Sequence, residues 1–231
     1  MSSGTSPSSS DSGVPVDAGV GDRNYYETWY TSRDWRFYAW LLAQMVEHSA
    51  PGPILDMGAG VGYVVEGAQR WGLDCCGIEG SRDAVEMGLR RWPPLRLRQH
   101  FLSEPLPFPN GSFQTVVMNQ VIEHLEPEVA QRAVAEIFRV LRPGGVAMIY
   151  SPSRFNEYER RVDPTHINLY SPTELRKLLL SGGFRRVVSL DDPLPIFGQN
   201  RVGRRLATTV FRVTRWDRLS ASANARAYKD G

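Results

Sequence analysis

Short apolar segments alternate with amphipathic segments from about residue 50 to the end of the chain. The apolar segments lack two-residue alternation, which is typical of strands covered on both faces. They predict strands at residues 53–57, 74–79, 95–101, 113–119, 146–151, 187–191 and 223–229. Helical spacing predicts helices at residues 61–71, 82–91, 127–140, 172–181 and 204–214. Such alternation is typical of α/β proteins, so we expect a doubly wound, mostly parallel seven-stranded sheet with helices on both faces.

The chain before the first strand has two different parts. Residues 1–22 are rich in Ser and Gly, and they contain too little apolar surface to offset the entropy of ordering, so we expect a disordered tail. Residues 23–231 then form one domain. Eight aromatic residues lie between residues 25 and 40, and Ser32 is a suitable N-cap for a helix that reaches about His48. We expect residues 25–48 to provide an N-terminal aromatic lid helix.

Composition narrows the range of partners. The chain has 27 Lys and Arg against 25 Asp and Glu, a net charge of +2, so nucleic acid is not an expected partner. No apolar run approaches the ~20 residues of a membrane span, and residues 1–22 do not resemble a secretory signal. Cys75 and Cys76 are adjacent and lack metal-binding spacing. We therefore expect neither disulfides nor zinc, and a reducing, cytoplasmic compartment.

A glycine-rich turn follows the first predicted strand. Asp56 lies near the end of that strand, and Gly58, Gly60 and Gly62 follow at alternate positions. Glycine allows a sharp turn and lets a ligand approach without meeting a Cβ atom. The dinucleotide fingerprint GxGxxG requires a third glycine where this chain has Tyr63, so the turn does not fit a nicotinamide dinucleotide. A carboxylate at Asp56 would repel a pyrophosphate but can attract a cationic amino-acid group.

Glu79 ends the second predicted strand, seventeen residues after Gly62. An acidic side chain at the tip of this strand can accept hydrogen bonds from both ribose hydroxyls of an adenosine. The alternative is a solvated acid in a loop. The spacing of Glu79 from the glycine turn favours the ribose role.

These motifs, together with residues 106–108, 113–125 and 141–145, resemble the class I S-adenosylmethionine-dependent methyltransferases over roughly residues 53–184. The chain looks closest to the small-molecule branch that includes ubiquinone- and menaquinone-pathway enzymes. The resemblance implies a Rossmann-like fold, S-adenosylmethionine as cofactor and S-adenosylhomocysteine as product. The cofactor-binding residues it implies are Asp56, Gly58, Ala59, Gly60, Gly62, Glu79, Gly80, Leu102, Ser103 and Asn119.

Two positions depart from the family's pattern. Members often have Asp where Leu102 stands, so the adenine amino group must meet backbone groups of Leu102 and Ser103 or a neighbouring side chain. Gln114 replaces another frequent Asp. Neither position performs the chemistry, so the departures concern the adenine contacts rather than the cofactor.

Two histidines are the candidate catalytic residues. His124 follows the fourth strand, and His166 lies in a polar linker of the kind that relatives place over the active site. A neutral imidazole can accept a proton or orient an acceptor, although His124 could instead cap a turn and His166 could belong to a loop held by its own hydrogen bonds. A metal on Glu123, His124, Asp163 and His166 is not expected, because no helical i,i+4 ligand pair exists.

The acceptor is expected to meet the least patterned parts of the chain. The candidate substrate residues are Tyr26, Trp29, Tyr30, Asp163 and Tyr170. Aromatic faces of the lid can also stabilise a sulfonium by ~0.5–2 kcal/mol. Replacing Tyr26 or Trp29 with Ala is then expected to raise the Michaelis constants and to leave the fold intact.

Residues 201–218 contain six arginines and one acid, Asp217. A solvated helix face or a site for an anionic substrate group is the commoner explanation of such a segment. Contact with nucleic acid or with a membrane surface is the alternative.

The combined interpretation is an enzyme that transfers a methyl group from S-adenosylmethionine to an oxygen or nitrogen of a small-molecule metabolite. The transfer is an in-line displacement, with a histidine as base if the acceptor must lose a proton. The alternatives are a methyltransferase for a lipid-like quinone precursor or for nucleic acid, and a cofactor-binding protein without turnover. The sequence indicates no particular oligomeric state.

Overall fold

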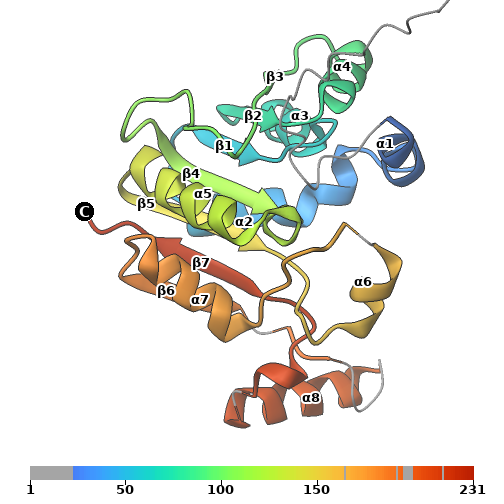
Figure 1. The fold of residues 1–231 in the computed structure, drawn as a ribbon, viewed down its shortest axis with the longest axis vertical. Coiled ribbons are helices and arrows are strands. Elements are labelled where there is room, and N and C mark those ends of the chain that lie inside the picture. The colour runs from blue at the N-terminus through green and yellow to red at the C-terminus, as the bar shows by residue number, and fades with distance from the viewer. Residues whose placement is uncertain (1–22, 164, 191, 195–199, 215) are drawn as a thin grey trace, which may run out of the picture.

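Seven strands form one sheet in the order β3-β2-β1-β4-β5-β7-β6. The computed structural model describes residues 23–163, 165–190, 192–194, 200–214 and 216–231, so the predicted tail at residues 1–22 lies outside it. The strands are β1 (Ile54–Met57), β2 (Cys75–Glu79), β3 (Leu97–Gln99), β4 (Phe113–Asn119), β5 (Leu141–Tyr150), β6 (Arg186–Leu190) and β7 (Asn224–Tyr228). Strands β1 to β5 are parallel, and β7 is antiparallel to β5 and β6 (Figure 1). The expected mostly parallel seven-stranded sheet is confirmed.

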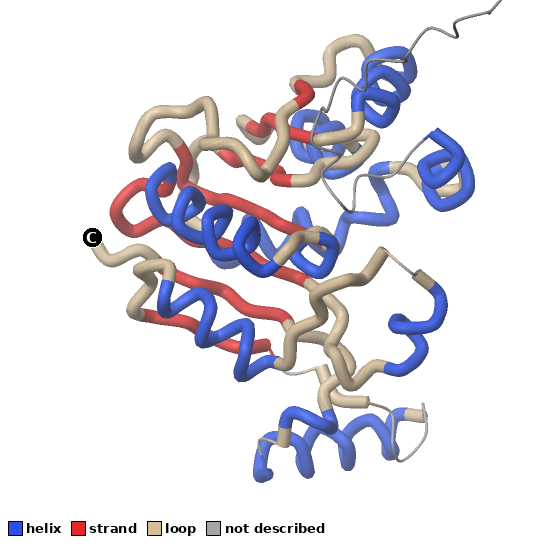
Figure 2. Tube along the Cα trace, in the orientation of Figure 1, coloured by secondary structure: helices blue, strands red, loops and turns tan. Residues whose placement is uncertain are grey.

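Helices alternate with the strands along the chain, as Figure 2 shows. The α-helices are α1 (Arg23–Tyr30), α2 (Ala39–His48), α3 (Tyr63–Arg70), α4 (Arg82–Arg91), α5 (Pro127–Val140), α6 (Glu157–Val162), α7 (Pro172–Ser181) and α8 (Arg201–Thr214). Short 3-10 helices are η1 (Trp35–Tyr38), η2 (Ile122–His124) and η3 (Asp217–Leu219). None of the helices in the described ranges is long and apolar enough to cross a bilayer.

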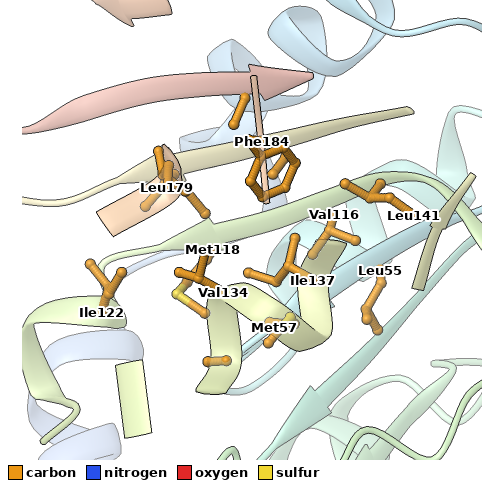
Figure 3. Close-up of a cluster of buried hydrophobic side chains, with 14 of the residues drawn as sticks. Leu55, Met57, Val116, Met118, Ile122, Val134, Ile137, Leu141, Leu179 and Phe184 are labelled. Carbon is orange, nitrogen blue, oxygen red and sulfur yellow. The ribbon is translucent and has the colours of Figure 1, made fainter. Parts of the chain in front are cut away.

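Helices α5 and α7 cover one face of the sheet (Figures 1 and 3). Ile137 of α5 and Leu179 of α7 are fully buried, and they belong to one core cluster with Val116 and Met118 of β4. Because successive strand residues point to opposite faces, Val117 belongs to the second cluster, on the other face. Helices α2, α3 and α4 supply that second cluster. The sheet is thus buried on both sides, which explains why its strands are continuously apolar.

Local signals set several helix ends. The Ser81 side chain accepts a hydrogen bond from the backbone N–H of Ala84 at the start of α4. Ser171 and Glu174 form the expected capping box at the start of α7. Strand β4 and helix α5 have the predicted bounds, and α5 ends where Leu141 takes up extended backbone.

The single helix expected over residues 25–48 is instead divided into α1, η1 and α2. The carboxylate of Asp34 accepts a hydrogen bond from the backbone N–H of Arg36 at 2.8 Å and starts a new helical segment there, so Asp34 and not Ser32 is the cap. Strand β5 begins at Leu141, earlier than expected, because Leu141 already pairs with Phe113, and the register shifts before pairing resumes between Thr115 and Val146. Helix α6 was not expected at all.

Candidate active site

The glycine turn after β1 lies at the edge of the sheet where the parallel strands end. Gly58, Gly60 and Gly62 all have positive φ values of 54° to 79°, which side-chain-bearing residues rarely adopt. A Cβ atom at Gly58 would lie 2.5 Å from a methyl carbon of Val121, so this position also needs glycine for space. The turn is held by the N–H groups of Gly58 and Ala59, which donate to the Ile78 carbonyl at 2.9 and 3.0 Å.

The carboxylate of Glu79 lies directly against this turn. One oxygen accepts a hydrogen bond from the Gly60 N–H at 2.8 Å. The other accepts from the Ser81 N–H at 2.9 Å and from the Tyr26 hydroxyl at 3.1 Å. Burial raises the pKa of Glu79, and the backbone N–H groups of Ser81 and Gly60 oppose that shift. An acceptor group is therefore fixed at the tip of β2, as a ribose site requires.

Asp56 is buried near the end of β1 and lines the larger of the two cavities described below. Its Oδ2 atom has no hydrogen-bond partner among the described residues. Burial, with a smaller contribution from the charge of Glu79, raises the pKa of Asp56 to about 7. A buried acceptor without a partner is costly, and a cationic amino group bound in the cavity would satisfy it. The residue therefore fits the amino-acid end of S-adenosylmethionine.

Tyrosine rings of α1 cover the glycine turn. A Cβ atom at Gly60 would lie 3.4 Å from the Tyr30 ring and 3.6 Å from the Tyr26 ring. The rings of Tyr26 and Tyr30 are 5.3 Å apart, and the Tyr25 ring contacts Tyr26 edge-on at the same distance. Helix α1 thus lies over the position expected for the adenosine.

Two adjoining cavities lie under this cover and share Tyr25, Tyr30, Gly58, Gln120 and His124 in their walls. The smaller, of about 100 Å³, lies between the turn, Glu79 and Leu102. The larger, of about 410 Å³, extends past Asp56 to the two histidines. Cavities for drug-sized ligands measure about 300–1,000 Å³, so the smaller one is too tight for an adenosine while α1 is in this position.

His124 and His166 lie side by side in the wall of the larger cavity, with ring centres 4.9 Å apart. His124 Nδ1 is 3.1 Å from the carbonyl oxygen of Thr165, and His166 Nδ1 is 3.2 Å from that of Glu159. Burial, and then the neighbouring His166, lower the pKa of His124, which favours a neutral ring. The Asp163 carboxylate accepts from the Thr165 N–H at 2.9 Å and from the Tyr25 hydroxyl at 3.3 Å. Asp163 therefore orders this loop.

Glu123 precedes His124 and was not among the expected site residues, except as an unfavoured metal ligand. It is fully buried, and neither carboxylate oxygen has a hydrogen-bond partner among the described residues. Burial raises its pKa to about 8. A single acid in the sequence Ile122-Glu123-His124-Leu125 carries no signal of burial, because the turn η2 that buries it depends on packing against other elements.

The structure brings most of the predicted site residues together. Gly58, Gly60, Glu79, Gly80 and Leu102 line the smaller cavity, and Asp56, Ala59 and Asn119 line the larger one. Gly62 caps α3 instead, and Ser103 lines neither cavity.

Of the predicted substrate residues, Tyr26, Tyr30 and Asp163 line the cavities. Tyr170 does not: it packs against the core cluster under α5 and α7, and its hydroxyl accepts a hydrogen bond from the side chain of Asn168. The side chain of Trp29 lies outside the described part of the structure. Cavity-lining residues that were not named individually from the sequence include Arg33, Phe37, Tyr38, Trp40, Tyr63, Gln120 and Glu159.

Comparisons with known proteins agree with this geometry. A family model described as a methyltransferase domain matches residues 30–190. The chain is 31% identical over 183 residues to a protein of Mycolicibacterium smegmatis named "probable S-adenosylmethionine-dependent methyltransferase", and the match covers 78% of this chain and 65% of that protein. It is 25% identical over 190 residues to a tRNA N(3)-cytidine methyltransferase of Danio rerio, covering 71% of this chain and 52% of that one. The chain thus spans about half to two thirds of these relatives.

Solved structures share the fold. A methyltransferase from Archaeoglobus fulgidus superimposes with a TM-score of 0.66 at 18% identity, covering 90% of this chain and 100% of that one. The glycine turn, the hydrogen-bonded Glu79 carboxylate and Asp56, whose Oδ2 atom has no partner among the described residues, all lie at one sheet edge, and a methyltransferase model matches across them. The chain belongs to the class I S-adenosylmethionine-dependent methyltransferases.

Proposed function

We propose that this enzyme methylates an oxygen or nitrogen of a small-molecule metabolite bound in the larger cavity beside His124 and His166. One observation carries the proposal: the same cavity is lined by Asp56 and by the histidine pair. A cofactor with its amino group at Asp56 and its ribose at Glu79 would direct its methyl group into the space between them. The acceptor would then approach from the histidine side.

Methyl transfer mainly requires the protein to align the reacting atoms. The sulfonium is already a good leaving group, and well-oriented model reactions gain up to ~7–11 kcal/mol from positioning. Tyr25 and Tyr30 would exclude water from the reacting atoms and place aromatic faces near the positive sulfur. A neutral His124 could accept a proton from the acceptor if deprotonation is needed.

The charges around the larger cavity favour a small acceptor over nucleic acid. Asp56, Glu159 and Asp163 line it together with a single Arg or Lys among the described residues, Arg33. A wall of this kind would repel the phosphates of an RNA strand, which basic side chains normally neutralise. The relationship to tRNA methyltransferases nevertheless makes tRNA the second candidate acceptor.

The compartment belongs to the same proposal. Cys75 and Cys76 are free thiols, and Cys75 is buried in β2, which supports the expected reducing, cytoplasmic setting. An acceptor metabolite made in that compartment would reach the enzyme directly.

The test is release of S-adenosylhomocysteine by the purified chain from S-adenosylmethionine. Small amines, hydroxyl-bearing metabolites and unmodified tRNA are supplied as separate acceptors. We expect turnover with a small acceptor, and a drop of 100-fold or more on His124→Ala but not on His48→Ala, because His48 lies on α2 away from the cavity. Turnover with tRNA alone would favour the second candidate, and binding without any turnover would contradict both.

A further inference from the structure

Three side chains beside the acceptor cavity converge on one point. Glu123 and His124 come from η2, and His166 comes from the loop after α6. Each offers one ligand atom, and these three atoms lie within 4.8 Å of one another. No pair of these residues has the i,i+4 spacing of two metal ligands on one helix. The fold brings the three residues together from a turn and a distant loop instead.

The hydrogen bonds of the two imidazole rings leave the Nε2 atom of each ring available as a metal ligand. A backbone carbonyl can only accept, so Nδ1 must be the donor in both His124 and His166. The Thr165 hydroxyl, which is 3.0 Å from His124 Nδ1, donates its own proton to Asp163 and is also an acceptor toward His124. In a neutral ring, Nε2 then carries the free lone pair. Metal-binding histidines are typically oriented by this kind of bond from the opposite nitrogen.

Glu123 supplies the third candidate metal ligand. Its carboxylate is fully buried, and no Lys or Arg forms an ion pair with it in the described ranges. The Ser151 hydroxyl, which is close enough to influence this carboxylate, donates instead to the Pro152 carbonyl at 3.3 Å. A buried polar group without a partner is costly, and a bound metal ion would give both Glu123 oxygens a partner in this position.

We propose that Glu123, His124 and His166 form a binding site for one divalent first-row transition-metal ion. Two imidazole nitrogens and one carboxylate oxygen suit Zn²⁺, Fe²⁺ or Mn²⁺ better than Mg²⁺, which prefers oxygen ligands. His124 and His166 line the larger cavity, so the remaining coordination positions face the acceptor. Such an ion would hold an oxygen of the acceptor and lower the pKa of that oxygen. This role of the ion rests on the proposed function.

The test uses the full chain after treatment with a chelator and dialysis. Calorimetric titrations with Zn²⁺, Mn²⁺ and Mg²⁺ are expected to give one ion per chain, with affinity falling in that order. Glu123→Gln and His166→Gln are each expected to weaken Zn²⁺ binding at least tenfold. His48→Gln, which alters a histidine on α2, should leave it unchanged. Co²⁺ should give visible absorption bands that are lost in both site variants.

Binding of S-adenosylhomocysteine by the same preparations separates the two proposals. Glu123 lines neither cavity, so Glu123→Gln should bind this product within about twofold of the unaltered chain. Product binding without Zn²⁺ or Mn²⁺ binding would overturn the metal site and leave the methyltransferase proposal intact. Equal Zn²⁺ affinity in Glu123→Gln and in the unaltered chain would also overturn it.

A separate observation concerns α8, which lies at the far end of the molecule from β3 (Figure 1). Its Gly203, Ala207 and Phe211 are buried against the body. Val202, Leu206 and Val213 are 68%, 51% and 79% exposed. At 100° per residue these three side chains fall within about 40° of one another on the opposite face.

Exposed arginines flank this apolar face. Arg201, Arg205 and Arg212 lie along one side of it, and α8 contains no acidic residue. We also infer that α8 docks on an anionic lipid surface, with its apolar face in the interface and its arginines on the head groups. RNA would account for the arginines but not for three exposed aliphatic side chains on one face.

Sedimentation with vesicles tests this assignment. The full chain is expected to bind vesicles containing phosphatidylglycerol, and to bind phosphatidylcholine vesicles at least tenfold more weakly. Val213→Asp should abolish binding, whereas Val46→Asp, at an exposed position on α2, should not. Arg205→Gln should weaken binding and reduce its salt dependence. Retention on RNA with no vesicle binding, or a Val213→Asp variant that still binds, would overturn the inference.

Discussion

Asp56 and Glu79 are neighbouring buried carboxylates with different surroundings. Glu79 accepts two backbone N–H groups and the Tyr26 hydroxyl, so it is already fixed as an acceptor. Asp56 Oδ2 has no partner among the described residues and faces the cavity. The difference follows from the glycine turn, which directs the N–H of Gly60 toward Glu79. We therefore propose that Glu79 accepts the ribose hydroxyls and that Asp56 binds the cationic amino group of the cofactor.

The pKa of Asp56 predicts a pH dependence for cofactor binding. Only the ionised carboxylate attracts the amino group, and burial raises its pKa to about 7. Affinity for S-adenosylhomocysteine should therefore rise with pH, by roughly 25-fold between pH 5.5 and pH 7.5 for a group of this pKa. Calorimetry at the two pH values measures the change. Asp56→Asn should bind weakly at both, and an unaltered chain without pH dependence would contradict the assignment.

The sequence indicated Asp56 and Glu79 because they lie near the ends of two predicted strands that meet at one sheet edge. It indicated His124 and His166 because they lie in the segments after the fourth and fifth strands. It could not predict the burial of Glu123 or the loss of Tyr170 from the site. Both depend on how the segments after β4 and β5 fold over the sheet, which no local pattern specifies. The Nδ1 bonds of His124 and His166 likewise come from carbonyls of a loop that is distant from His124 in sequence.

Among the secondary-structure elements, α1 has the largest effect on the site. Its tyrosines cover the glycine turn, and the Tyr26 hydroxyl occupies part of the acceptor capacity of Glu79. The smaller cavity, of about 100 Å³, is too tight for an adenosine in this arrangement. We therefore propose that α1 is a lid that moves when the cofactor binds, with its closed position stabilised by the hydrogen bond from Tyr26 to Glu79.

Tyr26→Phe tests this lid directly. The ring would still pack against Tyr25 and Tyr30, but the hydrogen bond that holds the closed position would be lost. Loss of a hydrogen bond worth about 0.5–1.5 kcal/mol is expected to raise the affinity of Tyr26→Phe for S-adenosylhomocysteine by up to about tenfold. Calorimetry measures it, with the exposed Tyr158→Phe as control. Weaker binding would show that the hydroxyl contacts the cofactor instead. Tyr26→Ala is less informative, because Tyr26 is buried and its loss would affect packing as well.

Elements with a strong periodic pattern were predicted well, and those shaped by packing were not. Strand β4 and helix α5 are continuous apolar or amphipathic segments with clear ends, and their bounds are as expected. Helix α6 has six residues, four of them charged, and its start depends on the side chain of Asn156. The break between α1 and α2 depends on the cap at Asp34, which competes with a continuous helical pattern.

At the scale of the whole molecule, the two core clusters on opposite faces of the sheet hold the strand ends in register. Phe184 follows α7 and is 1% exposed, and its ring packs edge-on against Phe138 of α5 at 5.2 Å. It therefore joins the antiparallel part of the sheet to the parallel part that carries the site. The sequence predicted seven strands, but not that β7 lies between β5 and β6, because strand order depends on contacts between distant segments.

Phe184→Ala should lower the free energy of unfolding by about 3–5 kcal/mol, because it leaves a cavity between α5 and α7. Urea unfolding followed by circular dichroism measures the loss. Tyr158→Ala, at a position that is 70% exposed, should change it by less than about 0.5 kcal/mol. Similar losses in the two variants would contradict the packing described for this face.

The most direct measurement is a calorimetric titration of the chain and of Glu79→Gln with S-adenosylhomocysteine. We expect one binding site for S-adenosylhomocysteine per chain. We also expect an affinity at least tenfold lower in Glu79→Gln, since a charged acceptor for the ribose hydroxyls is lost. Glu104→Gln, which alters an exposed carboxylate away from the cavities, should bind normally. Undiminished affinity in Glu79→Gln would contradict the account.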